Sequence, residues 1–166
     1  EKGIEMTGLN GYEGWQRVQD PKDSSRWQLT LLSKEQIKRL RANTWENLSF
    51  FRGIERVGGT VEDQGSTTLH GVKVHKVAFI HSPDIIFFRY FDEATGRLVL
   101  TETEAGGHIR EEGEMMVQGV RFPQRLITSS KNSEGHEITV SITFEKITLN
   151  ETFPESLFAV PALSVN

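Results

Sequence analysis

The sequence predicts a mainly β protein of the α+β class. We expect a curved antiparallel sheet or incomplete β-barrel of about seven or more strands, with one main helix at about residues 34–51. Strand-like runs bounded by turn-forming residues recur about every ten residues after Gly53. One stretch before it repeats its apolar residues at three- and four-residue steps. At 166 residues the chain can fill one core, so a single domain over 1–166 is expected.

The N-terminal part is expected to form a hairpin and then the helix. Four glycines interrupt the apolar residues in the first 15 positions, which favours a turn-rich hairpin. The segment 20–25, rich in Asp and Ser with one Pro, is expected to break the chain. Ser33 is a good helix N-cap, and Gln36 three residues later completes a capping box. Gly53 is the residue expected to end the helix.

The rest of the chain is expected to form strands of an antiparallel meander. The loop at 92–96 is typical of a tight hairpin, because its Asp can bond the backbone two residues on and its Gly can adopt a positive φ. The expected strands are 54–62, 68–81, 84–91, 97–104, 107–120, 122–129 and 137–149.

The faces of these strands differ in polarity. Between Ile138 and Glu145 apolar and polar residues alternate, so this strand is expected to be half-buried with one wet side. The strand at 84–91 is apolar on both faces and needs cover on both sides, because Phe87 shares one face with Arg89 while Phe88 lies on the other. A curved sheet that closes its concave face on the helix or on a ligand would supply that cover.

Composition argues against several classes of function. Lys and Arg number 19 against 23 Asp and Glu, for a net charge of -4, so no basic face for nucleic acid is expected. Cysteine is absent, which excludes disulfides, thiolate metal sites and cysteine nucleophiles. No apolar run approaches the roughly 20 residues that span a bilayer as a helix.

The sequence offers no recognisable catalytic constellation. The five histidines lack the close spacing of a zinc motif. The acidic residues Glu111, Glu112 and Glu114 are expected to guard a solvated sheet edge. No nucleophile elbow or phosphate-binding glycine loop is present. We therefore expect no enzymatic activity, no metal and no cofactor.

Aromatic residues on the helix and the central strands are the candidate ligand-binding positions. They could line an apolar cavity that takes an acyl chain. Alternatively, they interdigitate as ordinary core. The aromatic candidates are Trp45, Phe50, Phe51, Phe79, Phe87, Phe88 and Phe91. Arg89 completes the set, because it could meet a headgroup or a carbonyl; alternatively, it lies on a partly wet face with its stem buried.

Four segments resemble the outer-membrane lipoprotein-sorting proteins, the LolA/LolB-like superfamily. They are 8–15 (GLNGYEGW), 90–98 (YFDEATGRL), 119–123 (GVRFP), and 147–150 (ITLN) followed by 153–161 (FPESLFAVP). The resemblance covers the whole chain in order. It implies a half-barrel with helices at its mouth, an apolar interior for lipid acyl chains, and a periplasmic carrier or receptor role in transport without catalysis.

The resemblance also implies partners and a location. We expect lipid or lipoprotein acyl chains as ligand, a membrane-associated partner, and a periplasmic or otherwise extracytoplasmic location, with an export signal removed before Glu1. Members of the superfamily usually place a helix and several strands ahead of the segment resembling 11–15. We therefore expect a truncated domain, or an open sheet edge completed by a homodimer. The alternative function is a structural or protein-interaction module whose sheet pairs with another copy or domain.

Overall fold

The computed structural model describes residues 4–49, 52–103 and 106–162, which form two compact units. The N-terminal unit contains the described residues of Glu1–Phe50 and Thr152–Asn166. The sheet unit contains those of Phe51–Glu151. The single domain expected from the sequence stays a prediction.

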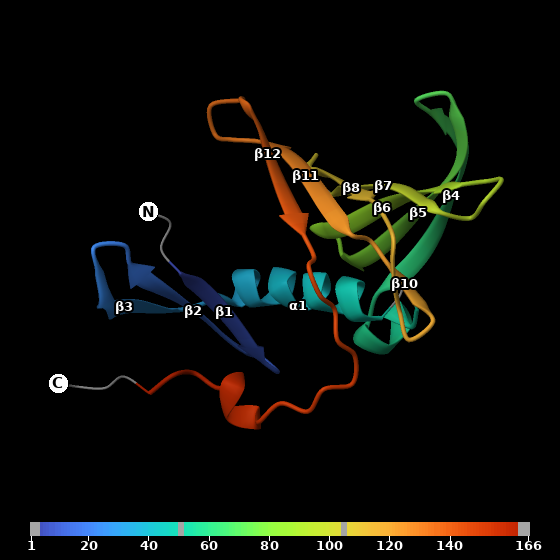
Figure 1. The fold of residues 1–166 in the computed structure, drawn as a ribbon. Coiled ribbons are helices and arrows are strands. Elements are labelled where there is room, and N and C mark those ends of the chain that lie inside the picture. The colour runs from blue at the N-terminus through green and yellow to red at the C-terminus, as the bar shows by residue number, and fades with distance from the viewer. Residues whose placement is uncertain (1–3, 50–51, 104–105, 163–166) are drawn as a thin grey trace. The chain divides into compact units, whose positions relative to one another are not determined.

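The N-terminal unit is a three-stranded antiparallel sheet followed by the main helix (Figure 1). The third strand was not expected, because the polar segment 20–25 was interpreted as a break. It contains a hairpin turn instead, in which the Asp20 carboxylate accepts a hydrogen bond from the Lys22 N–H at 2.8 Å. The elements are β1 (Glu5–Asn10), β2 (Glu13–Asp20), β3 (Asp23–Leu31) and α1 (Lys34–Leu48).

The predicted capping box at the start of α1 is confirmed. The Ser33 hydroxyl accepts from the Gln36 N–H at 3.3 Å, and the Gln36 side chain accepts from the Ser33 N–H at 2.8 Å. The helix ends at Leu48, where the N–H of Ser49 donates to the Trp45 carbonyl at 2.9 Å. Gly53 does not end this helix. It adopts φ 73° at the start of a short 3-10 helix, η1 (Ile54–Val57).

Trp15 connects the first strands of the N-terminal unit with the C-terminal segment that belongs to the same unit. Its indole is 7% exposed and lies over Gly8, the residue directly opposite it on β1. The indole N–H donates to the carbonyl of Phe158 at 3.0 Å, next to the short 3-10 helix η2 (Glu155–Leu157). Two of the segments that carry the family resemblance, 8–15 and 153–161, therefore contact each other.

The sheet unit is built on an open seven-stranded antiparallel sheet, which confirms the predicted fold class. The strand order is β12-β11-β8-β7-β6-β5-β4, so β12 and β4 form its edges (Figure 1). A separate two-stranded ribbon pairs β9 with β10. The strands are β4 (Thr60–Leu69), β5 (Val72–Ser82), β6 (Ile85–Asp92), β7 (Leu98–Thr103), β8 (His108–Glu112), β9 (Met115–Val117), β10 (Val120–Phe122), β11 (Arg125–Lys131) and β12 (Glu137–Thr143).

Tight turns divide the chain differently from the sequence prediction in two places. The expected strand 68–81 is cut by a two-residue turn in which His70 and Gly71 have φ of 49° and 81°. Positive φ at both central residues is the geometry that matches the twist of a hairpin. The expected strand 107–120 is likewise divided into β8 and β9 by Gly113, with φ 68°. The predicted hairpin at 92–96 is confirmed, since Asp92 accepts from the Ala94 N–H at 2.7 Å.

Two further expectations about strands are wrong. The stretch 54–62 begins as the 3-10 helix η1, whose Ile54 is 1% exposed, and β4 starts only at Thr60. Strand β12 was expected to be half-buried, but all seven of its residues are exposed. Its alternation is real, yet its apolar face remains open, with Val140 52% exposed. Alternation fixes which side chains share a face and cannot fix what covers that face.

Replacing Gly8 with Ala should destabilise the N-terminal unit. A Cβ at this position would lie 2.2 Å from the Trp15 ring, so the indole must shift and weaken its bond to Phe158. Overpacking of this kind costs about 1–3 kcal/mol. We expect a lower thermal midpoint in the tryptophan near-UV circular dichroism signal. Thr7→Ala, at the exposed neighbouring position, is the control and should melt like the parent protein.

Candidate ligand-binding surface

The pairing register brings residues distant in sequence into rows across the seven-stranded sheet. We call the face that carries Arg89 the arginine face, and the opposite one the glutamate face. One row on the arginine face is Asp63, Val77, Arg89, Thr101, Ile109, Thr128 and Val140. The adjacent row on the glutamate face is Glu62, Ala78, Phe88, Glu102, His108, Ser129 and Thr139.

The arginine face is buried at its centre and open at both edges. Phe79 and Phe87 lie directly opposite each other on β5 and β6 and are 4% and 6% exposed. On the edge strands, Val61 and Val140 are 50% and 52% exposed. Apolar residues therefore recur from covered to accessible positions along this face, with Thr101 and Thr128 between them.

Arg89 lies at the buried centre of the arginine face. Its guanidinium carbon is 4.6 Å from the centroid of the Phe79 ring and 5.6 Å from that of Phe87. A guanidinium over an aromatic face is attracted by the ring quadrupole, and the attraction grows as water is removed. The side chain is 4% exposed, so it holds these two rings in place more readily than it meets solvent.

The glutamate face carries a polar cluster over aromatic rings. The Lys76 ammonium lies 4.3 Å from the centroid of the Phe88 ring and 5.3 Å from that of Tyr90. The Tyr90 hydroxyl donates to the Glu102 carboxylate at 2.8 Å. Burial raises the pKa of Tyr90, the bond to Glu102 raises it further, and Lys76 opposes the shift. With Ala78 at 2% exposure, this strand pair is buried on both faces, as its apolar pattern predicts.

The histidines occupy separate environments. The imidazole of His75 is 2.7 Å from the Asp63 carboxylate, and both side chains are substantially exposed. The N–H of Gly65 and then His75 hold the pKa of Asp63 below its ordinary value. His81 meets the Phe87 ring edge-on, with centroids 5.8 Å apart. Among the described residues, no three His, Asp or Glu side chains gather in a way that could hold a metal ion.

The acidic cluster of Glu111, Glu112 and Glu114 was expected to guard a solvated sheet edge. That expectation is wrong. Strand β8 lies between β7 and β11, inside the sheet. Glu111 pairs with Arg121 at 3.1 Å, and Glu114 pairs with Arg97 at 3.4 Å. These two ion pairs border a hollow of about 320 Å³ that Leu98 and Gly113 also line. Its carboxylates are matched by arginines, so the hollow has no obvious excess of either charge.

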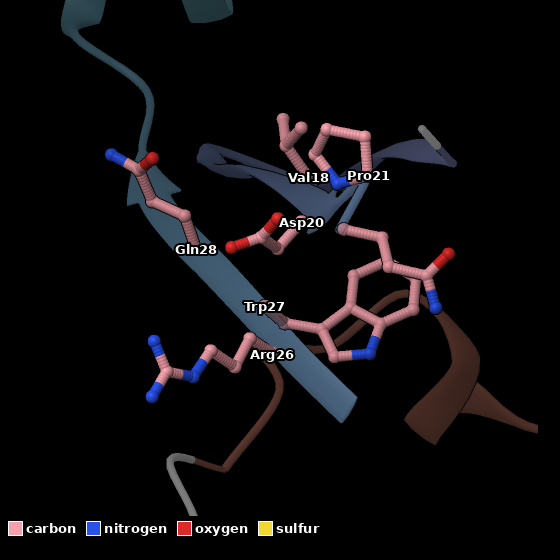
Figure 2. Close-up of a pocket in the computed structure, with 7 residues that line it drawn as sticks. Val18, Asp20, Pro21, Arg26, Trp27 and Gln28 are labelled. Atoms are coloured by element: carbon pink, nitrogen blue, oxygen red, sulfur yellow. The ribbon is translucent and has the colours of Figure 1, made fainter. Parts of the chain in front are cut away.

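A second hollow, of about 390 Å³, lies on the β2–β3 hairpin of the N-terminal unit (Figure 2). The indole of Trp27 forms one wall, and the Pro21 ring and Val18 lie across from it (Figure 2). The guanidinium carbon of Arg17 lies 3.8 Å from the centroid of the Trp27 ring, and this stacking contact helps to hold the indole in place. A single carboxylate, that of Asp20, borders the hollow, which provides no acid and base pair for catalysis.

The structure brings together only part of the predicted ligand-binding set. Phe79, Phe87 and Arg89 form one cluster, and the half-buried Phe91 belongs to the same face. Phe88 belongs to the glutamate face, so it cannot line the same cavity as the others. Neither of the two hollows described above contains any of these residues.

The remaining candidates are on or near the helix. Trp45 is half-buried on α1 in the N-terminal unit, where its carbonyl accepts the hydrogen bonds that end the helix. Phe50 and Phe51 lie outside the described residues.

The accessible apolar residues at the sheet edges were not predicted from the sequence. Ile138 and Ile142 are 46% and 50% exposed, and they share the arginine face with Val140. Their alternation with Thr and Ser was visible in the sequence, but it was interpreted as a core face. The sequence did not reveal their exposure, because β12 lies at the edge of the sheet and no local sequence pattern encodes that position.

Comparisons with known proteins establish the fold and nothing finer. No family model matches the chain, and no curated protein matches it. The chain is similar in structure to a DUF1329 family protein from Desulfovibrio piger ATCC 29098, with a TM-score of 0.52 and 10% sequence identity. The match covers 96% of this chain and 72% of that one. The resemblance to lipoprotein-sorting proteins gains no support from family models or curated proteins, and it stays a prediction.

The described helices do not include one long and apolar enough to cross a membrane.

Tyr90 should titrate above the ordinary tyrosine pKa of 10.0. Because folding favours the neutral phenol, this stabilisation is present below that pH and is lost as the pH rises through the folded pKa. We expect an ultraviolet titration to show a late phenolate step that disappears in Tyr90→Phe. Tyr12→Phe changes the other tyrosine and should leave that step in place. A late step that survives in Tyr90→Phe would contradict the assignment.

Proposed function

We propose that the chain is an extracytoplasmic, non-catalytic module that binds lipid or lipoprotein acyl chains on the arginine face of its seven-stranded sheet. The observation that carries this proposal is the recurrence of apolar residues along that face. They extend from the buried pair Phe79 and Phe87, through the half-buried Ile109, to the exposed Val140 on β12, with Thr101 and Thr128 between them.

The physical gain from such binding is burial of hydrocarbon. Removing apolar area from water contributes about 25 cal/mol per Å², and an acyl chain needs no polar partner along its length. The half-buried Ile109 and Val77 lie in the same row as Val140 and would extend the contact inward. Arg89 is then a positioning residue that holds Phe79 and Phe87, rather than a headgroup ligand.

The carrier role rests on the resemblance to lipoprotein-sorting proteins. That resemblance supports a periplasmic module that moves acyl chains between membranes or membrane-associated partners. The structural match to the D. piger protein supports the fold on which the binding face is built.

Two measurements on the intact chain test the proposal. Native mass spectrometry of protein purified from cells should show co-purified lipid. A fluorescent fatty acid should bind to delipidated protein and be displaced by unlabelled palmitate. The proposal is contradicted if neither lipid nor displacement is found.

A pair of substitutions on β8 tests which face binds. Ile109→Gln places an amide on the arginine face, and burying an amide without a partner costs about 1–3 kcal/mol, so we expect affinity to fall at least about fivefold. Arg110→Gln places the same side chain on the exposed glutamate face of that strand and serves as the control. Equal losses in the two variants would count against the arginine face.

A further inference from the structure

Strand β12 is a sheet edge without the usual protection against strand pairing. In the part of the chain that the structure describes, it pairs with β11 on one side only. All seven of its residues are exposed. Between Ile138 and Thr143 the sequence contains no charged residue and no proline, and the pairing with β11 shows no register shift. Such an edge is a template for another strand.

The other edge of the same sheet is protected. Strand β4 contains a register shift between Asp63 and Ser66, where Gly65 adopts φ 78°. The Asp63 carboxylate accepts from the Gly65 N–H at 2.7 Å, which fixes the bulge. Bulges and acidic side chains twist an edge away and repel an incoming strand. The contrast between the two edges indicates that β12 is the one that can be extended.

The hydrogen-bond phase of β12 shows which backbone groups are available. Just beyond its ends, the Phe144 N–H donates to the Gln124 carbonyl and the Asn132 N–H donates to the His136 carbonyl, both at 2.9 Å. Bonded and non-bonded pairs alternate along an antiparallel ladder, so even-numbered residues direct their backbone groups toward β11. The odd-numbered residues therefore direct theirs out of the sheet. These are Glu137, Thr139, Ser141 and Thr143.

We propose that β12 pairs antiparallel with β12 of a second copy of the chain, in a register centred on Val140. In this register Glu137 faces Thr143 of the other copy, and Thr139 faces Ser141. All four are residues whose backbone groups point outward, so each of these facing pairs can exchange both of its hydrogen bonds, and the pairs between them are the non-bonded ones. The pairing is also the one with the greatest overlap, because Val140 is the middle residue of the strand.

The side chains match in the same register. Ile138 faces Ile142 of the other copy, and Val140 faces its own counterpart, so the exposed apolar residues cover one another on the arginine face. On the glutamate face, the hydroxyl residues Thr139 and Ser141 meet. Glu134 and Lys146 flank Val140 at equal distances in sequence, which brings opposite charges toward each other at both ends.

A second copy is the occupant that this symmetry favours. An isologous contact needs a surface complementary to itself, and β12 satisfies that requirement in its backbone, polarity and charge. The contact is a single strand pair, so we expect reversible, concentration-dependent association. The inference does not depend on lipid binding, and delipidated protein is used to test it.

Sedimentation velocity over a range of concentrations gives the first test. The parent chain should pass from monomer to dimer as concentration rises. Val140→Lys places like charges opposite each other across the two-fold axis and should remain monomeric, as should Val140→Glu. Mixing these two variants should restore the dimer, because the register pairs position 140 with itself.

The matched control is Val61→Lys. Val61 is an apolar residue on the same face of the other edge strand, and its 50% exposure is close to the 52% of Val140. This variant should dimerise like the parent chain. Loss of dimer in Val61→Lys as well as in Val140→Lys would show that general apolar association, and not strand pairing, holds the copies together.

Two further variants test the backbone geometry. Ser141→Pro removes an outward N–H that β11 does not use, so the dimer should be lost while the circular dichroism spectrum is retained. Val140→Cys should form a disulfide between copies, because the facing Cα atoms of a non-bonded pair lie about 4.5 Å apart and the chain has no other cysteine. Val61→Cys should not cross-link. A parent chain that stays monomeric at every concentration, or absence of the Val140→Cys cross-link, would overturn the proposal.

Discussion

The pairing register of the seven-stranded sheet is the constraint on which the rest of the account depends. Because side chains alternate with a period of two, a slip of one residue in any strand would transfer its side chains to the opposite face. The register seen here places Arg89 between Val77 and Thr101 and aligns the row that ends at Val140. That single alignment creates both the buried aromatic cluster and the series of apolar residues that reaches the edge of the sheet on the same face. The proposed ligand and the proposed second copy each use part of this surface.

Local chemistry allowed much of the fold to be predicted. The capping box at Ser33 and Gln36 specifies the helix start, and the Asp92 turn specifies a hairpin, since each depends on residues within one turn of chain. Strand β3 was missed because polar turn residues near Pro21 indicate a chain reversal as readily as a break. The turn at His70 was missed because a histidine with positive φ is uncommon, so the strand pattern appeared continuous.

The candidate site was predictable in composition and not in arrangement. Alternation correctly separated Phe87 and Arg89 from Phe88, since it depends only on strand geometry. It could not show that β12 would lie at an edge, because strand order is set by contacts between residues far apart in sequence. The same limit applies to Glu111, which looked like an edge residue and proved to be an ion-paired residue inside the sheet. The pattern of a single strand shows which side chains share a face. Whether that face is buried depends on the assembled sheet.

The central claim is that acyl chains bind on the arginine face, and methyl-resolved NMR with a spin-labelled fatty acid tests it most directly. The account predicts selective broadening of the methyl signals of Ile109, Val77 and Val140 as the probe is added, with the signals of Ile86 and Ile127 on the glutamate face retained. Broadening confined to the glutamate-face methyls, or no broadening at a probe concentration that binds other fatty-acid carriers, would contradict it.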